Sequence, residues 1–314
     1  MKIRHIYKML VALMFTTSCG DYLDVIPDNI PTIDHAFIDR ISAQKFLATC
    51  YSFIPNDEAA PNNPAMLGNE CWIAKEGRGY FNFFGSDVWD IFREQGYQTV
   101  GNPISNYWDG GDGATKNLWI AIRDCNIFLE NIHKPQDLTE GERKRWIAEV
   151  TFLKAYYHYY LWMRYGPIPI TDINIPVSAT PDEVRVYRDP SDDVVEYIVK
   201  TIDKAVPDLF EKVSSESQEL GRITKPIALA IKAKCLTYAA SPLYNGNPYY
   251  ANYVDSRGIH LFPTEYKAEK WQRAATALKE AIDASEKAGH KLYYYDKYFG
   301  SISDFTKRTL NIRL

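Results

Sequence analysis

Cysteine is scarce in this sequence, and neither cysteine nor histidine is spaced as in a metal site. Five cysteines and six histidines occur in 314 residues, without a CxxC, HxxxH or HxH pattern. Structural zinc sites need such closely spaced pairs, so we expect no metal site and no cofactor. The DGGDG run at 109–113 lacks the alternation of a calcium loop and is predicted to form a turn. Three cysteines fall among apolar neighbours in helical patterns and are predicted to be buried: Cys50, Cys125 and Cys235.

Signatures of the common enzyme classes are also missing. The chain contains no GxSxG, HExxH, P-loop or GxGxxG pattern. A glycosidase would need two carboxylates at one cleft, and no pair among the 40 acidic residues is marked by its context. We therefore expect that the protein is not an enzyme.

Basic blocks are absent as well. The formal net charge is -4, and loss of residues 1–18 would remove three basic residues and no acid, leaving -7. Proteins that bind nucleic acid neutralise phosphates with clustered lysine and arginine. This composition argues against nucleic acid as a partner.

No apolar run near the N-terminus is long enough to cross a bilayer. Residues 9–15 are apolar, whereas a spanning helix needs about 20 such residues. Basic residues precede this run, and small residues and Cys19 follow it. The pattern predicts a lipoprotein signal peptide at 1–18, with the mature chain exported and anchored through acylated Cys19. The alternative is an ordinary signal peptide that is cleaved nearby, with Cys19 incidental.

Aromatic residues, by contrast, are abundant, with 23 tyrosines and seven tryptophans. Many of them lie in residues 55–113, where asparagine, glycine, proline and aspartate interrupt every helical period. An irregular segment of this length in a compact domain is usually functional or disordered. Its aromatic content argues against disorder, so we expect a loop-rich functional insertion.

This insertion combines flat rings with planar polar groups, which is the pairing that sugar recognition requires. Pyranose rings stack on aromatic faces, while their hydroxyls need paired donors and acceptors. The same rings are equally compatible with the core of a loop-rich subdomain, and the sequence leaves both interpretations open. The candidate glycan-binding residues form three clusters: Trp72, Arg78, Tyr80 and Asn82; Trp89 and Asp90; and Asn106, Tyr107, Trp108 and Asp109.

The remaining chain is predicted to be helical. Thr139 and Glu142 form a capping-box pattern, Gly166 precedes a proline, and Thr224 is a candidate N-cap. The tyrosines at 156–160 are interpreted as helix packing. A stripe of Trp271, Ala275, Leu278 and Ile282 is predicted to pack the last helix. Apolar periodicity predicts helices at 42–54, 114–134, 142–165, 192–210, 225–241 and 266–288.

Two helix pairs follow from these ranges, within 142–210 and 225–288. Each combines a helix rich in alanine and tyrosine with a more amphipathic one. Small alanine positions let helices approach closely, as in tetratricopeptide packing, although the strict consensus of that repeat is not met. The predicted fold class is all-α, a tetratricopeptide-like helix-hairpin scaffold with long irregular aromatic-rich loops.

Four stretches resemble the SusD/RagB family of outer-membrane lipoproteins, and the resemblance covers essentially the whole mature chain, 19–314. They are SCGDYLDVIPDN at 18–29, IRDCNIFLENI at 122–132, AEVTFLKAYYHYYLWMRYGPIPI at 148–170 and GRITKPIALAIKAKCLTYAASPLYNG at 221–246.

The resemblance implies a lipid-anchored, surface-exposed glycan-binding protein without enzymatic activity. Such proteins capture oligosaccharides at the outer membrane and pass them to a TonB-dependent, SusC-like transporter. Family members are longer, so this chain is expected to correspond to their N-terminal portion. The competing interpretation is an exported helical-repeat scaffold that binds a protein partner without sugar. The sequence does not name the glycan.

Overall fold

A computed structural model of the chain describes residues 32–57, 99–101, 103, 106–110 and 116–292. The predicted signal peptide, Cys19 and most of the predicted 55–113 insertion lie outside these residues. Among the residues described, no helix combines the length and apolarity needed to cross a membrane.

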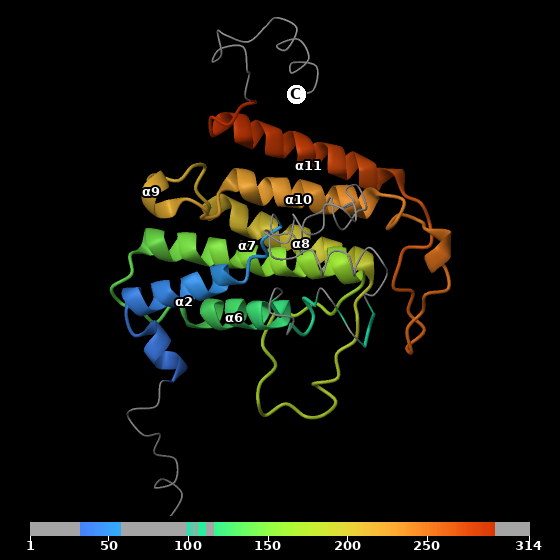
Figure 1. Cartoon of the computed structure of the whole chain (residues 1–314), viewed down its shortest axis with the longest axis horizontal. Coiled ribbons are helices and arrows are strands. Elements are labelled where there is room, and N and C mark those ends of the chain that lie inside the picture. Colours follow the sequence, from blue (N-terminus) through green and yellow to red (C-terminus); the bar gives the residue numbers. More distant parts are fainter. Residues whose placement is uncertain (1–31, 58–98, 102, 104–105, 111–115, 293–314) are drawn as a thin grey trace, which may run out of the picture.

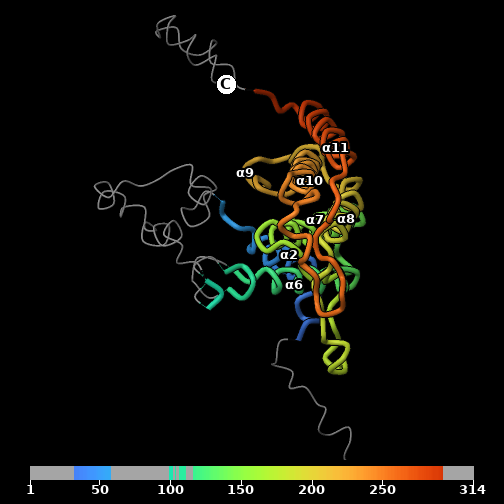
Figure 2. The backbone as a smooth tube through the Cα atoms, turned by 90° about the vertical axis from the view of Figure 1, so that its right-hand side faces the viewer, coloured from blue at the N-terminus to red at the C-terminus, as the bar shows by residue number. Residues whose placement is uncertain are grey.

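The described part of the chain is helical and holds isolated β-bridges but no strand, which confirms the all-α prediction. Figure 1 shows the long helices stacked side by side, from α6 and α2 at one end to α11 at the other, and Figure 2 views the same stack nearly end-on. The elements are η1 Ile33–Phe37, α2 Arg40–Ser52, α6 Leu118–Asn131, α7 Glu140–Tyr165, α8 Ser191–Ala205, η5 Val206–Asp208, α9 Glu216–Glu219, α10 Lys225–Ala240, η6 Pro248–Tyr250 and α11 Ala268–Lys287.

Helix α7 is the central element of the stack, and it contacts α2, α6, α8 and α10. Its start carries the expected capping box, in which Thr139 and Glu142 satisfy each other's backbone N–H groups. It ends at Gly166, whose φ of 69° is strained for residues with a side chain. Three of the tyrosines at 156–160 are buried in the core, and Tyr156 is half-buried. The packing interpretation of these tyrosines is therefore confirmed.

The starts of two other helices differ from the sequence prediction. Helix α2 begins at Arg40, because the carboxylate of Asp39 accepts a hydrogen bond from the backbone N–H of Ser42 at 2.7 Å. Helix α6 begins at Leu118, where Asn117 caps two backbone N–H groups. Thr224 occupies the N-cap position of α10, but its side chain makes no capping hydrogen bond.

The predicted packing stripe of α11 is wrong. Trp271, Leu278 and Ile282 are exposed, with 43% of Trp271 accessible, and Ala275 is exposed too. The buried face instead consists of three alanines, Ala274, Ala277 and Ala281. Helix α11 has two apolar stripes, and the small one packs on α10 because alanines let two helix backbones approach closely.

The three described cysteines are buried, as the sequence predicted, and none of these three forms a disulfide. Cys50 lies in α2, Cys125 in α6 and Cys235 in α10. Burial raises the pKa of the Cys125 and Cys235 thiols, so both remain protonated and act as small apolar groups.

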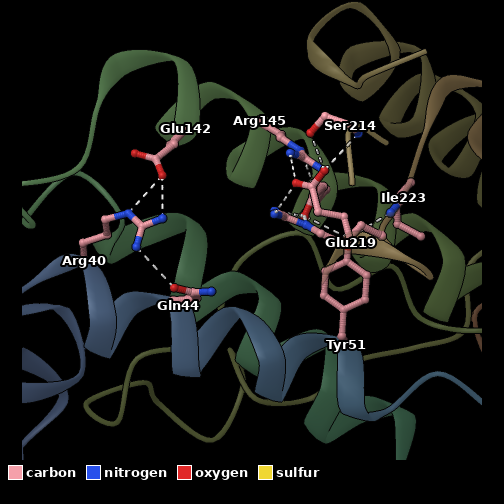
Figure 3. Close-up of polar contacts among 10 residues, drawn as sticks. Arg40, Gln44, Tyr51, Glu142, Arg145, Ser214, Glu219 and Ile223 are labelled. Atoms are coloured by element: carbon pink, nitrogen blue, oxygen red, sulfur yellow. Dashed lines mark hydrogen bonds and ion pairs between the residues drawn. The ribbon is translucent and has the colours of Figure 1, made fainter. Parts of the chain in front are cut away.

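A buried ionic network ties α2, α7 and the segment before α10 together (Figure 3). At its centre is Glu149, whose side chain is completely buried in α7. One carboxylate oxygen lies 2.9 Å from Nε of Arg145. The other accepts hydrogen bonds from Nη2 of Arg222 at 2.8 Å and from the Tyr51 hydroxyl at 2.9 Å. A buried carboxylate is tolerated because its partners replace the water that it loses.

Glu219, in the short helix α9, extends this network. Its carboxylate lies 2.6 Å from Nη1 of Arg145 and accepts two hydrogen bonds from Ser214. Burial alone would raise the pKa of Glu219, but the bonds from Arg145 and Ser214 outweigh it and lower that pKa to about 2. Both acids of the network therefore face positive charge, and they fix the loop between η5 and α10 onto α7.

Candidate functional site

The third predicted glycan-binding cluster forms a tight turn just before α6. Asn106 organises this turn, because its amide donates to the carbonyl of Gly110 at 3.1 Å and its side-chain oxygen accepts from the N–H of Asp109 at 2.9 Å. Gly110 has a φ of 73°, and a Cβ there would lie 3.1 Å from the backbone nitrogen of Asn117. The turn is thus held from within and also against the start of α6.

Tyr107 anchors the turn to α7. Its ring is only 2% exposed and packs edge-on against Tyr160, with the ring centroids 4.9 Å apart. Its backbone N–H donates to the Tyr165 hydroxyl at 2.9 Å. Burial raises the pKa of Tyr160 and Tyr165, so both phenols remain protonated at neutral pH. The position of Tyr107 is an interior one.

Trp108 is the half-buried ring of the turn. Trp119 and Tyr165 each pack against it in a T-shaped arrangement, at centroid distances of 5.0 and 5.4 Å. The guanidinium of Arg188 lies 5.2 Å from its centroid, a cation–π distance. Arg188 is itself fixed, because its Nη1 donates to the carbonyls of Tyr165 and Pro167. The indole is therefore held in one orientation beside a fixed positive charge.

Asp109 completes the cluster as its exposed member. Its backbone takes part in the turn, since its carbonyl accepts from the Asn117 amide at 3.2 Å, while its side chain is exposed. In the described part of the chain, Nε and Nη2 of Arg188 make no hydrogen bond and stay available as donors. A fixed indole, a guanidinium and a carboxylate together offer one stacking surface and both polarities of hydrogen bond.

The other two predicted clusters lie outside the described residues: Trp72, Arg78, Tyr80, Asn82, Trp89 and Asp90. Asp57, the last described residue before them, accepts a hydrogen bond from the Tyr160 hydroxyl at 2.9 Å. Because Tyr160 also packs on Tyr107, Asp57 lies next to the 106–110 turn.

Sequence reasoning missed two groups of aromatic and basic residues. Tyr165 and Arg188 frame Trp108 from distant parts of the chain, and no local signal marks them. The loop after α10 carries stacked rings, with Tyr250 and Phe262 centroids 4.1 Å apart, and a Tyr249 that is 93% exposed. The sequence feature that could have marked this loop is the high density of tyrosines in residues 243–253, LYNGNPYYANY.

Metal ligands do not gather in the part of the chain that the structure describes, where no group of three or more histidine, cysteine, aspartate or glutamate residues is placed to hold an ion. His158 is fully buried. Its Nδ1 lies 2.8 Å from the backbone carbonyl of Lys154, and its Nε2 accepts a hydrogen bond from the backbone N–H of Thr171 at 3.1 Å. Burial lowers the pKa of His158 to about 4, so the ring is neutral at physiological pH.

Comparison with known proteins points to one family, the SusD-like proteins. The SusD-like family model described as "starch-binding associating with outer membrane" matches residues 21–236. No curated protein sequence matches the chain.

Several solved structures share the fold. The protein BT4246 is 28% identical and superposes with a TM-score of 0.63, over 88% of this chain and 47% of its own. The SusD-like protein BF3747 of Bacteroides fragilis NCTC 9343 is 19% identical, with a TM-score of 0.53 over 83% of this chain and 40% of its own. A laminarin-binding SusD-like protein is 16% identical, with a TM-score of 0.52 over 83% and 49%. The chain spans about half the length of these proteins.

Proposed function

The chain belongs to the SusD-like family, and we propose that it is a lipoprotein of the outer membrane that binds oligosaccharides at the cell surface. In this proposal residues 1–18 are a signal peptide and Cys19 carries the acyl anchor. The family description supports association with the outer membrane. The protein captures glycan without cleaving it and passes it to a SusC-like, TonB-dependent transporter.

The half-buried Trp108 ring is the observation that carries the binding proposal. A sugar stacks on an indole through its apolar C–H face, and the gain is largest when the ring is already fixed. Trp119, Tyr165 and Arg188 fix this ring before any ligand arrives. The free donors of Arg188 and the carboxylate of Asp109 then supply hydrogen bonds to hydroxyls at the edge of the stacked sugar.

The test is a thermal melt of the full chain with a panel of soluble oligosaccharides that includes starch and laminarin fragments. A ligand of the folded state raises stability by RT ln(1 + [L]/Kd), so one class of sugar should shift the melting temperature. Trp108→Ala should then weaken binding about tenfold, a loss of about 1.4 kcal/mol. Trp271→Ala, on the exposed face of α11, is the matched control and should bind like the parent.

A second variant, Asp109→Ala, separates a loss of binding from a loss of folding. Asp109→Ala leaves the turn intact, because the turn uses only the backbone of that residue. It should weaken binding severalfold without changing the melting temperature of the free protein. Parent-like binding by both Trp108→Ala and Asp109→Ala would move the site away from this turn.

An exported scaffold for a protein partner is the second candidate function. The exposed apolar side chains of Trp271, Leu278 and Ile282 on α11 favour it, because contiguous exposed apolar surface marks interaction sites. The two functions separate in the same melt, since a scaffold that does not bind sugar would show a transition that no oligosaccharide shifts.

A further inference from the structure

A cavity lies between α6, α7 and α8, apart from the 106–110 turn. Its volume is about 370 Å³, within the range of roughly 300–1,000 Å³ that is usual for small-molecule sites. Leu129 of α6 and Ile147 of α7 give it an apolar floor. Thr151 and Tyr197 add hydroxyl groups to its wall. The cavity therefore offers apolar surface together with hydrogen-bonding groups.

Lys154 is the unusual residue of this cavity, because only 7% of it is exposed. Its ammonium donates to Asp172 twice, at 2.8 Å to the carboxylate and at 3.1 Å to the backbone carbonyl. An ammonium has three N–H donors, so one remains beyond these two acceptors from the described residues. Burying an ammonium is costly unless its donors are satisfied. A further acceptor inside the cavity would satisfy the third.

Asp172 is already committed to neighbours within the wall. Its carboxylate accepts from Lys154 and also from the Tyr197 hydroxyl at 2.8 Å. The hydrogen bond from Lys154 is the main cause that lowers the pKa of Asp172, so this carboxylate is ionised at neutral pH. The negative charge of Asp172 is thus paired with the buried Lys154.

Two more lysines at the rim leave the cavity with an excess of positive charge. Lys200 and Lys204 lie four residues apart on α8, where like charges repel. Glu196 lies 3.6 Å from Lys200, but it also accepts a shorter contact of 2.9 Å from Arg273. The lining therefore holds three lysines against the single carboxylate of Asp172. An anion in the cavity would relieve both the repulsion and the unused donor.

We propose that this cavity binds the carboxylate of an acidic saccharide, such as a uronic acid residue of a longer glycan. A uronic acid offers a carboxylate to the lysines, hydroxyls to Thr151 and Tyr197, and an apolar ring face to the floor. That the anion belongs to a saccharide rests on the proposed function. The cavity lies on the same side of α7 as Tyr165, because residues 147, 151, 154, 158 and 165 recur at helical spacing and share one face of that helix.

The cavity and the turn lie along the same face of α7. Tyr165, which flanks Trp108, lies at one end of that face, and Lys154 lies further along it. Ring contacts connect the two, since Trp119 packs on His158 and His158 packs on Tyr197, with centroid distances of 6.4 and 4.9 Å. His158 is fully buried between them, so the turn and the cavity are two separate places on this face.

The experiment measures binding of digalacturonic acid, the neutral disaccharide galactobiose and inorganic phosphate to the full chain by calorimetry. We expect digalacturonic acid to bind at least tenfold more tightly than galactobiose, with an affinity that falls as salt rises. The double variant Lys200→Gln/Lys204→Gln should lose about tenfold for the acidic sugar only. Lys234→Gln, an exposed lysine of α10 outside the cavity, is the control and should change nothing.

The outcomes separate this inference from the proposed function. Equal affinity for the acidic and neutral disaccharides, or no effect of the double variant, would overturn the acidic-sugar site. Phosphate binding as tightly as digalacturonic acid would also overturn it and leave a simple anion site. If neutral glycans bind through Trp108 while the acidic probe does not, the proposed function stands and this inference fails. Lysine-dependent binding of the acidic probe, with no effect of Trp108→Ala on any sugar, supports the acidic-sugar site in the cavity and refutes glycan binding at the 106–110 turn.

Discussion

Replacing Glu149 by glutamine should destabilise the protein strongly without changing its shape. The carboxylate is completely buried and bonds to Arg145, Arg222 and Tyr51. Glutamine has almost the same volume, so no cavity forms. It removes the negative charge, however, and leaves two arginines facing Glu219 alone. The perturbation therefore isolates the electrostatic part of the network.

The expected magnitude follows from the burial of the pair. Removing one partner of a buried ion pair costs about 3–5 kcal/mol, because the other charges stay desolvated. For a chain of this size each kcal/mol shifts the melting temperature by about 2–4 °C, so the fall should be on the order of 10 °C. Urea denaturation should show a lower midpoint with an unchanged slope, since the surface exposed on unfolding is the same.

The control lies on the same helix. Glu140 lies 3.3 Å from Lys144 at the exposed surface of α7, and an exposed pair four residues apart contributes about 0.3–0.5 kcal/mol. Glu140→Gln should therefore shift the melt by no more than a few degrees. If Glu149→Gln and Glu140→Gln behave alike at pH 7, the buried network does not stabilise the fold and the reasoning from burial is refuted.

Two further predictions concern acid stability and membrane anchoring. The free energy of unfolding should fall by up to about 3 kcal/mol as pH falls from 6.5 to 4. Burial lowers the pKa of His158 to about 4 in the folded chain, so the unfolded chain binds a proton at this imidazole first. His158→Gln should flatten this part of the pH dependence of the urea midpoint, and an unchanged slope would contradict the assignment. Cys19→Ala should move the protein from the membrane fraction to the soluble fraction and abolish acyl labelling; a variant that stays membrane-bound would disprove lipidation at this residue.

Local signals in the sequence predicted the central helix well. Thr139, Glu142 and Gly166 mark the ends of α7 through contacts with their own neighbours, so a short window holds all the information. Family recognition also came from contiguous stretches, and the match to the family model confirms it. Helix α2 begins two residues before the predicted Ser42, because the carboxylate of Asp39 caps the helix.

The packing face of α11 could not be read from periodicity. The large stripe of Trp271, Leu278 and Ile282 has a helical period, and so does the alanine stripe beside it. Hydrophobicity favours the first, yet the close approach to α10 selects the second. The choice depends on the shape of a neighbouring helix, which a single helix sequence does not contain.

The candidate site divides in the same way. Asn106, Tyr107, Trp108 and Asp109 are adjacent in sequence, so their cluster was visible as a pattern. Which member is interior and which is accessible depends on α7 and on Arg188, 80 positions further along the chain. The clusters between Trp72 and Asp90 remain predictions.

Helix α7 also fixes the distance between the two proposed binding sites. Lys154 and Tyr165 lie eleven positions apart on one unbroken helix, which at 1.5 Å per residue sets their separation along the axis at about 16 Å. A stiff spacer of fixed length rewards a ligand chain that reaches both ends, because the second contact then forms at high effective concentration. Shorter chains can engage only one end at a time. The rise of a single helix would thus set the minimum chain length that bridges the two proposed sites.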